Sequence, residues 1–400
     1  MKKKVLVLGC TGSIGTSTLD IIRAFPGRFE VCGLSAHTNQ KKLNGLAAEF
    51  GCTNTALTAD AVSADKTANT ARNLSAAALS NEKIAQLIEK SKADIAVNGI
   101  AGAAGLMPSV LCLENGIDLA LANKETIVMA APLIRALAEK KGRKIIPVDS
   151  EHSALFALIE RFGKERVNSL ILTASGGPFR TTAREKLKDV KPEDALKHPT
   201  WSMGQKISID SATLANKGLE VIEACRLFDM EPEKVKVTVH PQSLVHSLIE
   251  TVDGDLYAQI SEPDMKRPII SALTYPDMIE NNLKKLDLFS ALGNPDGNAE
   301  GVTMSFYPAR FDDFPLLGAA YEAQKKGGSY TIAYNAANES AVSMFLQKKI
   351  GFTQIADIVS EVLEKDRTQE PRTFNDVFAI DEQVRREAEI CGQRLIRGNI

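Results

Sequence analysis

The sequence has little of what marks a secreted, membrane-bound or nucleic-acid-binding protein. Its six cysteines are scattered without a Cys-x-x-Cys pair, which fits reduced thiols and offers no zinc knuckle. The formal net charge is -2, so no overall basic field attracts nucleic acid or a membrane surface. The apolar run Val5–Leu8 is too short for a secretory signal, and Arg135 interrupts the stretch that comes closest to a membrane span. We therefore expect a cytoplasmic protein that holds any anionic ligand in a local site.

The chain is long enough for two or three domains. Its 400 residues, 44% apolar and 24% charged, have an ordinary globular composition. Residues 1–149 alternate short apolar runs with helical patterns, which predicts a Rossmann-like parallel sheet. The pattern then predicts a central α+β domain over 150–275, a linker over 276–312 and a helical bundle over 313–400. The expected strands are 5–8, 29–34, 53–58, 94–98, 118–122, 144–148, 167–173, 235–240, 247–251 and 256–260.

A glycine-rich turn follows the first expected strand and opens a helix. In Gly-Cys-Thr-Gly-Ser-Ile-Gly, Gly9 allows the tight turn, Gly12 the approach of a pyrophosphate, and Gly15 close packing of the helix on the sheet. This context predicts a dinucleotide whose phosphates lie at the helix N-terminus. A glycine turn without a ligand is the alternative. The cofactor-binding residues expected here are Gly9, Thr11, Gly12, Ser13, Ile14 and Gly15.

The end of the second expected strand indicates which dinucleotide binds. A domain specific for NAD usually has an Asp or Glu there for the ribose 2′-hydroxyl, and residues 35–39 contain neither. Donors and positive charge take its place, which suits a 2′-phosphate and favours NADPH. The alternative is that this polar stretch is only a loop and a helix start. Its residues are Ala36, His37, Thr38, Asn39, Lys41 and Lys42.

Two further turns follow later strands of the same sheet. Residues 98–105 are small and could let the nicotinamide side of a dinucleotide approach, or could simply pack a helix closely on a strand. Residues 122–125 lie where such sheets bind ligands, so Lys124 could contact a substrate oxygen, although a lone loop lysine is more often only solvated. The cofactor-binding residues expected in these turns are Ala101, Asn123, Lys124 and Glu125.

Two carboxylates end the run Ile-Ile-Pro-Val-Asp-Ser-Glu-His at 145–152. In an extended segment Asp149 and Glu151 would point the same way, and two carboxylates held together require a divalent cation or a shared proton. Oxygen ligands without cysteine suit Mg2+ or Mn2+ better than Zn2+. The alternative is a pair of solvated acids at a strand end, with an N-cap for the next helix.

A third cluster, at 210–223, combines hydrogen-bond donors with acids. Glu220 and Glu223 are three residues apart on an expected helix and so share a face, although acids at this spacing are usually ordinary surface residues. If Glu220 joins Asp149 and Glu151, three carboxylates would bind Mg2+ or Mn2+ and leave positions open for substrate oxygens. The side chains that precede these acids form a plausible phosphate-binding site, and residues 175–177 could supply another part of it. The residues of this site are Asp210, Ser211, Thr213, Asn216 and Lys217.

Together these segments resemble the 1-deoxy-D-xylulose 5-phosphate reductoisomerase family over nearly the whole chain. That family makes 2-C-methyl-D-erythritol 4-phosphate in the non-mevalonate isoprenoid pathway. The resemblance implies a rearrangement of a ketose phosphate, reduction by NADPH, a Mg2+, Mn2+ or Co2+ ion, and a homodimer. The motifs that carry it are GCTGSIG (9–15), GAAGL (102–106), LANKE (121–125), PVDSEH (147–152), ASGGPF (174–179), HPTWSMG (198–204), SATLANKGLE (211–220), HPQSLVHS (240–247), EPDM (262–265) and NAANE (335–339).

The resemblance also implies roles for individual residues. Residues 175–205 would form a flap over the active site, His152 and His246 match histidines that line or support it, and Gly204 would join the cofactor site. The implied metal ligands are Asp149, Glu151 and Glu220, with Glu223 close by. The implied catalytic residues are Lys124, Ser150, Glu151, His152, His198 and Lys217. The implied substrate-binding residues are Lys124, Ser150, Glu151, Ser175, His198, Trp201, Met203, Ser211, Asn216, Lys217 and Glu220.

Several alternatives stay open at this point. The general acid and base could be Lys217, His152 or a water on the metal. Residues 36–39 read Ala-His-Thr-Asn where some family members have Ala-Gly-Lys-Asn, so the residue that holds the 2′-phosphate is open. A metal-assisted, NADP-dependent sugar-phosphate dehydrogenase without rearrangement is a second possible function. A non-catalytic dinucleotide sensor is a third, although it would have no need of three carboxylates.

Overall fold

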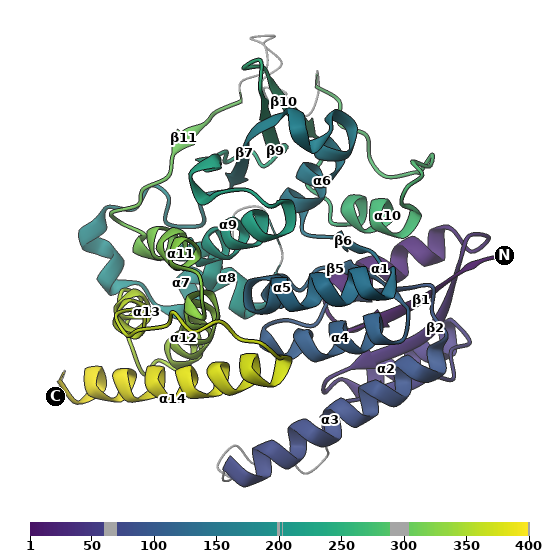
Figure 1. The fold of residues 1–400 in the computed structure, drawn as a ribbon, viewed down its shortest axis with the longest axis horizontal. Coiled ribbons are helices and arrows are strands. Elements are labelled where there is room, and N and C mark those ends of the chain that lie inside the picture. Colours follow the sequence, from purple (N-terminus) through teal and green to yellow (C-terminus); the bar gives the residue numbers. More distant parts are fainter. Residues whose placement is uncertain (60–69, 198–200, 202, 289–303, 399–400) are drawn as a thin grey trace. The chain divides into compact units, whose positions relative to one another are not determined.

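The computed structural model describes residues 1–59, 70–197, 201, 203–288 and 304–398 (Figure 1). Its internal contacts divide the chain into two units. The first comprises Met1–Thr126, Pro132–Asp149 and Met265–Glu280, and the second comprises Ile127–Ala131, Ser150–Asp264 and Asn281–Ile400. Among the helices described, none has the length and apolar character needed to cross a membrane.

Six parallel strands form the sheet of the first unit, in the order β3-β2-β1-β4-β5-β6. Val5–Leu8 is fully buried, as expected for a parallel strand covered on both faces. The strand order reverses beside β1, which pairs with β2 on one side and β4 on the other, and such a switch point is where these sheets bind ligands. The expected Rossmann-like sheet is confirmed. Its strands are β1 (Lys3–Leu8), β2 (Phe29–Ala36), β3 (Thr55–Leu57), β4 (Ile95–Asn98), β5 (Asp118–Leu121) and β6 (Ile145–Pro147).

The helices of the first unit connect these strands, with one exception. Helix α10 comes from much later in the chain and packs on α1, β5 and β6. Helix α5 has a non-helical residue, Ala130, two positions before Pro132, because a proline within a helix removes a hydrogen bond and its ring clashes with the preceding turn. The helices are α1 (Ser13–Ala24), α2 (Gln40–Glu49), α3 (Thr70–Ser91), η1 (Ala103–Gly105), α4 (Leu106–Glu114), α5 (Lys124–Lys141) and α10 (Lys266–Thr274).

The sheet of the second unit is mixed, with the order β10-β9-β7-β8-β11. Strands β7 and β8 are parallel, and the other pairs are antiparallel. Helix α6 packs on β7, β9 and β10, and α9 packs on β7 and β8, which confirms the expected α+β arrangement. The strands are β7 (Val167–Ala174), β8 (Val235–Val239), β9 (Val245–Thr251), β10 (Leu256–Ile260) and β11 (Tyr307–Pro308).

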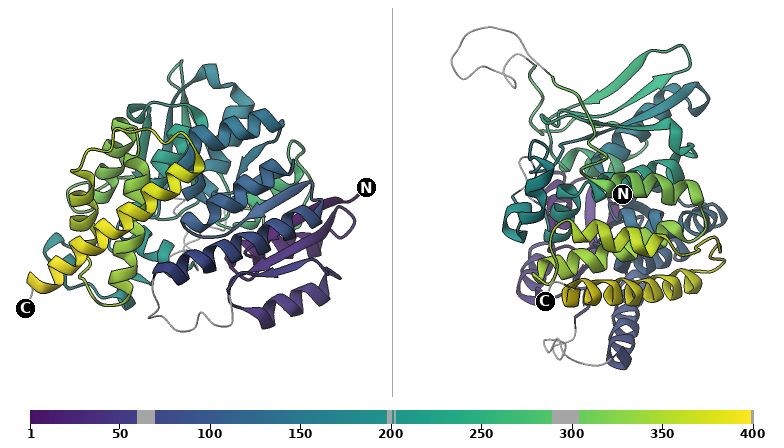
Figure 2. Two further views of the ribbon diagram at one scale, coloured as in Figure 1. Left: turned by 60° about the horizontal axis from the view of Figure 1, so that its bottom comes forward. Right: turned by 90° about the vertical axis from the view of Figure 1, so that its left-hand side faces the viewer.

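The expected C-terminal helical bundle is also confirmed, and it supports α9 within the second unit. Figure 2 shows its helices, coloured green to yellow, gathered together. Helices α9, α11 and α12 approach closely at Gly218, where a Cβ atom would lie 2.6 Å from the Tyr334 hydroxyl and 2.8 Å from the Ala320 Cβ. The helices of this unit are α6 (Ser150–Phe162), η2 (Lys164–Arg166), η3 (Arg184–Asp189), α7 (Pro192–Ala195), α8 (Gln205–Ala212), α9 (Ala215–Phe228), η4 (Pro232–Lys234), α11 (Pro315–Lys326), α12 (Tyr330–Leu346), α13 (Gln354–Leu363) and α14 (Phe374–Gly398).

Candidate active site

The glycine turn of the first unit joins β1 to α1 at the switch point of the sheet. Gly9 has a φ of +80°, which favours glycine, and a Cβ at Gly15 would lie 2.4 Å from the carbonyl oxygen of Gly9. A Cβ at Gly12 would meet only that same oxygen, at 3.4 Å, among the described atoms. Internal packing therefore explains glycine at 9 and 15, whereas at 12 a side chain would extend into the space that a bound phosphate would use.

Lysine 42 supports this turn from helix α2. Its Nζ donates to the carbonyl oxygen of Thr11 at 3.0 Å and to the Thr16 hydroxyl at 3.1 Å. Asn39 caps α2 by accepting from the Lys42 backbone N–H, and His37 hydrogen-bonds to the Thr58 hydroxyl at 2.9 Å. Positive charge thus lies beside the turn. The side chains of His37, Thr38 and Asn39 are exposed, and Ala36 is buried at the end of β2.

Asn123 joins the two small-residue turns of the first unit. Its amide nitrogen donates to the carbonyl oxygens of Ile100 and Gly102 at 2.8 Å and to Glu125 at 2.9 Å. Its side-chain oxygen accepts from the Thr126 N–H and caps α5. The side chain is therefore committed to protein partners, so a contact of Asn123 with a cofactor would come from its backbone. Ala101, in the turn that Asn123 holds, is exposed.

The two carboxylates of residues 149–151 do not share an extended segment. Strand β6 ends at Pro147, and Ser150 begins α6, so Glu151 lies in the first turn of a helix. The expected extended arrangement is wrong because a serine followed by an acid favours a helix start, where the helix dipole stabilises the carboxylate. Asp149 instead pairs with Lys124, whose Nζ lies 2.6 Å from its carboxylate within the first unit. The Ser150 hydroxyl donates to Glu151 at 2.6 Å.

A buried lysine joins two carboxylates in the second unit. Lys217 and Glu220, one helical turn apart on α9, are 3% and 1% exposed. The Lys217 ammonium lies 2.8 Å from Glu151 and also pairs with Glu220, to which Asn216 donates as well. Burial alone would lower the pKa of Lys217, but Glu151 and then Glu220 raise it above its usual value. The side chain therefore stays charged.

A second buried pair joins His152 of α6 to Glu223, on the next turn of α9. His152 Nε2 donates to the backbone carbonyl of Glu220 at 3.0 Å, and its Nδ1 lies 3.5 Å from the Glu223 carboxylate. Because Nε2 must carry a proton to donate, Nδ1 can pair with Glu223 only if one more proton is shared between them. This pair orients both side chains beside the Lys217 cluster.

The loop after β7 lies against the end of α8. A Cβ at Gly177 would lie 2.6 Å from the carbonyl oxygen of Ser211, so the two backbones touch there. The Gly177 N–H donates to the Ser175 hydroxyl at 3.3 Å. Leu214 then turns the chain with a φ of 59°, and Asn216 and Lys217 fall in the first turn of α9, where backbone N–H groups favour an anion. The structure thus brings the loop of Ser175 to Ser211, one turn before Asn216 and Lys217.

Other residues singled out from the sequence have separate positions. Trp201 and Met203 are partly buried, and Gly204 is the exposed residue before α8. Thr213 hydrogen-bonds to the carbonyl oxygens of Ile209 and Asp210 and is therefore a structural residue. His246 is buried in β9. His198 lies outside the described residues.

The sequence analysis gave no role to Asn338 of α12, which the structure places behind α8. Asn338 donates to the buried carboxylate of Asp210 at 2.8 Å, and Lys206 pairs with the other oxygen of that carboxylate at 2.8 Å. Asp210 precedes Ser211, so this contact fixes the end of α8 that meets the Ser175 loop. The asparagines among the alanines of residues 335–339 are the signal that could have identified it, because amide side chains on a helix face that packs in a core require polar partners.

These two sites define a class of protein. A dinucleotide-type turn in one unit, and a buried cluster of carboxylates with a lysine in the other, are features of a metal-assisted, NADP-dependent oxidoreductase. Family models agree: that for 1-deoxy-D-xylulose 5-phosphate reductoisomerase matches residues 5–131, and those for its C-terminal domains match 145–228 and 260–387. The chain belongs to the 1-deoxy-D-xylulose 5-phosphate reductoisomerase family.

Individual relatives support the same assignment. The 1-deoxy-D-xylulose 5-phosphate reductoisomerase of Treponema denticola is 52% identical over 384 residues, 96% of each chain, and that of Treponema pallidum is 44% identical over 389 residues, 97% of each. The Zymomonas mobilis enzyme in complex with NADPH has a TM-score of 0.85 and 38% identity, covering 98% of this chain and 99% of its own. A DOX-P reductoisomerase with NADPH, fosmidomycin and magnesium has a TM-score of 0.85 and 37% identity, covering 98% of each.

Proposed function

We propose that this protein rearranges 1-deoxy-D-xylulose 5-phosphate and reduces the product with NADPH to 2-C-methyl-D-erythritol 4-phosphate, in isoprenoid biosynthesis. The observation that carries the proposal is the buried Lys217 between the carboxylates of Glu151 and Glu220. A sugar phosphate with neighbouring oxygens requires both a cation and an anion-binding group, and this cluster offers carboxylates for the first and an ammonium for the second. The glycine turn of the first unit supplies the dinucleotide site.

The donor set suits a hard divalent cation. One oxygen of Glu151 and one of Glu220 lie within 4.8 Å of each other, with a positive charge already between them. Because consecutive Cα atoms are about 3.8 Å apart, the Cα of Asp149 lies within about 7.6 Å of that of Glu151. We therefore assign Mg2+, Mn2+ or Co2+ to Asp149, Glu151 and Glu220. A bound ion would polarise the substrate oxygens and stabilise the negative charge that develops on them.

The substrate phosphate belongs, in this proposal, at the start of α9. Lys217 keeps its charge, and the first turn of α9 adds backbone N–H groups. The contact between Gly177 and Ser211 brings a second set of hydroxyl donors to the same place. Binding energy from the phosphate would then orient the reacting carbons. The proposed phosphate and hydroxyl ligands are Ser175, His198, Ser211, Asn216 and Lys217, with Lys124, Ser150, Trp201 and Met203 as further substrate contacts.

The protonation states favour a donor over a base at Lys217. Its pKa lies above the usual value because Glu151 and Glu220 outweigh the effect of burial, so it can hold a proton at a substrate oxygen but is poorly suited to remove one. His152 donates to the backbone carbonyl of Glu220 and lies 3.5 Å from the Glu223 carboxylate, so we assign it to orienting this part of α9. NADPH would supply hydride, held by the turns at 9–15, 36–39, 101 and 123–125 and by Gly204.

The experiment that tests the function follows the loss of NADPH absorbance with 1-deoxy-D-xylulose 5-phosphate, with and without Mn2+. We expect turnover that requires the metal, and Glu220→Gln should lower Mn2+ affinity about 100-fold. Glu322→Gln, at an exposed glutamate of α11, is the matched control and should behave like wild type. Turnover that survives a chelator would contradict the metal assignment. Oxidation of polyol phosphates without turnover of the ketose phosphate would indicate a simple dehydrogenase instead.

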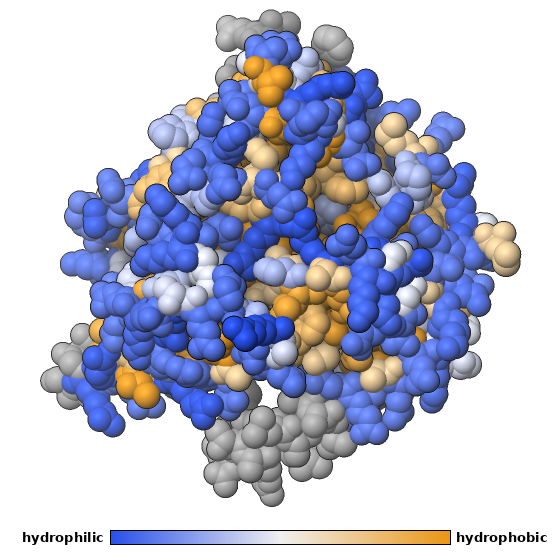
Figure 3. All heavy atoms as spheres, viewed as in Figure 1, coloured by the Kyte–Doolittle hydropathy of each residue, from blue (hydrophilic) through white to orange (hydrophobic). Residues whose placement is uncertain are grey.

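We also propose that the protein forms a homodimer through strand β10. This strand lies at an edge of the second sheet and exposes apolar residues, with Leu256 58% and Ile260 42% exposed, beside Val252 in the preceding turn. Figure 3 shows apolar side chains among hydrophilic ones at this end of the second unit, at the top of the view. An unpaired apolar edge readily adds a strand from another chain. Light scattering should give a dimer, which Leu256→Lys should weaken and Ile390→Lys, at an exposed residue of α14, should not.

The roles of the chain segments complete the proposal. Residues 1–149 would bind NADPH, and residues 150–275 would hold the metal and the substrate, with a flap at 175–205. Residues 276–312 would link these two segments to the helical residues 313–400. The linker and flap lie partly outside the described residues. We place the protein in the cytoplasm, since all six cysteines are free thiols, as a reducing compartment would keep them.

A further inference from the structure

One arginine outside the proposed site binds the backbone that leads away from the Ser175 loop. Arg310 follows β11, and its guanidinium donates from Nη1 to the carbonyl oxygen of Arg180 at 2.8 Å and from Nη2 to that of Thr182 at 2.8 Å. A longer bond, 3.4 Å, reaches the carbonyl oxygen of Phe179. Residues 179–182 form a tight turn, closed by the Thr182 N–H on Phe179. Arg310 therefore holds three carbonyl groups of one turn.

Every N–H group of the Arg310 guanidinium has an acceptor. Its Nε–H donates to Asp313 at 2.6 Å, and Nη2 pairs with the same carboxylate. With two N–H groups on the carbonyls of Phe179 and Arg180, one on Thr182 and two on Asp313, all five N–H groups are used. Only a planar fork can serve these acceptors at once, so lysine cannot replace Arg310.

The turn held by Arg310 packs against the loop of Ser175. A Cβ at Gly176 would lie 3.0 Å from the Cβ of Arg180, and Gly176 has a φ of +84°. The next residue, Gly177, touches the carbonyl oxygen of Ser211 in the same way. Continuous contact thus runs from Arg310 through Arg180 and Gly176 to the Ser175–Ser211 edge of the proposed phosphate site.

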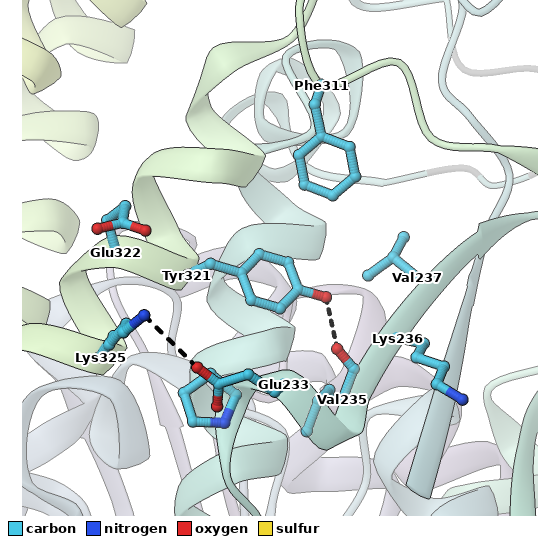
Figure 4. A pocket seen from close by; sticks show the side chains of 9 residues that line it. Glu233, Val235, Lys236, Val237, Phe311, Tyr321, Glu322 and Lys325 are labelled. Atoms are coloured by element: carbon cyan, nitrogen blue, oxygen red, sulfur yellow. Dashed lines mark hydrogen bonds and ion pairs between the residues drawn. The ribbon is translucent and has the colours of Figure 1, made fainter.

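The segment that carries Arg310 is itself firmly attached. Strand β11 pairs with β8 through Tyr307 and Val239. Phe311 lies over the hollow of Figure 4, 6.1 Å from the ring of Tyr321, whose hydroxyl donates to the carbonyl oxygen of Val235. Arg310 also lies over the ring of Phe314, 5.5 Å from its centre. A rigid support on β8 and α11 therefore stands behind the turn.

We propose that Arg310, held by Asp313, is a positioning residue that sets the Ser175–Gly177 loop for binding the substrate phosphate. The inference rests on the proposed function. According to this inference, affinity for the sugar phosphate depends on Arg310, although Arg310 contacts neither substrate nor cofactor. Without the guanidinium, the three carbonyl oxygens that it binds would hydrogen-bond to water instead, and the turn would move. Gly176 and Gly177 would then no longer be held against Arg180 and Ser211.

The test compares steady-state kinetics of wild type, Arg310→Ala, Arg310→Lys and Asp313→Asn. We expect the KM for 1-deoxy-D-xylulose 5-phosphate to rise about tenfold in Arg310→Ala, with the KM for NADPH unchanged. Arg310→Lys should recover little of this loss, whereas guanidinium ion added to Arg310→Ala should recover part of it. Asp313→Asn, the milder change, should move the same KM in the same direction. Arg386→Ala, at an exposed arginine of α14, is the control.

The outcomes separate the inference from the proposed function. Wild-type protein that fails to convert the ketose phosphate would overturn the proposed function and this inference with it. Active wild type, with Arg310→Ala and Asp313→Asn less heat-stable but unchanged in both KM values, would show a merely structural arginine and overturn the inference alone. If Arg310→Ala does not fold, Asp313→Asn decides the question.

Discussion

Lys217 is the residue on which the candidate site depends most. Its ammonium is almost fully buried, and two carboxylates, Glu151 and Glu220, meet it there. A buried charge is strongly unfavourable without a partner, so each of the three side chains depends on the others. The same geometry makes the ammonium an internal substitute for a metal ion.

Replacing this lysine should therefore make the protein dependent on a cation for stability. In Lys217→Met the two carboxylates face each other without a counter-charge, and we expect a loss of about 3–5 kcal/mol in the free energy of unfolding. Added Mn2+ should raise the unfolding temperature of this variant more than that of wild type, because the ion takes the place of the ammonium. Lys348→Met, which breaks an exposed pair with Glu193, is the control. If Mn2+ raised the unfolding temperatures of wild type and Lys217→Met equally, the proposed role of Lys217 as the counter-charge of both carboxylates would be contradicted.

A surface carboxylate gives a separate prediction about pH. Lys236, then Ser169 and Asn168, hydrogen-bond to Glu250 and lower its pKa to about 2. Because an unfolded glutamate has a pKa of about 4.3, this stabilisation is complete above that pH and is lost as the pH falls toward 2. Glu250→Gln should be less stable than wild type at neutral pH, and the difference should shrink over this acid range. Chemical denaturation at several pH values measures it, and a difference that does not depend on pH would refute the assignment.

At the scale of elements, a buried polar contact with α12 holds helix α8. Asn338 of α12 donates to Asp210, and both side chains are buried. Asn338→Ala leaves that carboxylate with one partner fewer, and we expect a loss of about 1–3 kcal/mol in stability. Substrate affinity should fall as well, because Ser211 follows Asp210. Ser343→Ala, at an exposed position of the same helix, should change neither quantity. Loss of stability with unchanged substrate affinity would show that α8 does not depend on this contact for its function.

The strands and helices follow largely from local pattern. Strand β1, helix α1 and the later strands lie where apolar runs and helical periodicity place them, because buried parallel strands are continuous apolar runs. Strand β11 has only two residues, and its pairing with β8 depends on where the rest of the fold places this segment. Its contact is tertiary, and no periodicity over two residues can indicate it. The helix start at Ser150 corresponds to the alternative considered for residues 149–151, an N-cap after the strand end, and not to the extended segment that the paired carboxylates suggested.

The site was predictable to the extent that its residues lie in motifs. Glu151, Glu220 and Lys217 stood out because acids and donors cluster at short spacing. Their burial did not follow from the sequence, since exposed acids have the same spacing. Arg310 could not be found, because its partners at 179–182 are about 130 residues away and are backbone carbonyls, which every residue possesses.

At the scale of the whole molecule, the chain passes between its two units five times, after Thr126, Ala131, Asp149, Asp264 and Glu280. The last return brings α10 to the first sheet, where Ile269 and Leu273 are fully buried. A fragment of residues 1–149 would therefore lack part of its own apolar core. We expect it to aggregate, whereas the same fragment with residues 265–280 added through a flexible linker should unfold cooperatively on heating. Cooperative unfolding of the shorter fragment would contradict this.

This path of the chain limits how such a gene can be recombined. A cut at the codon for Asp149 follows the boundary between two segments of the units but leaves neither product with a complete interior. The nucleotide module cannot be exchanged for that of another oxidoreductase by a single crossover, since α10 would have to travel with it. Exchange of the nucleotide-binding unit would therefore require three separate segments of the chain to be moved together.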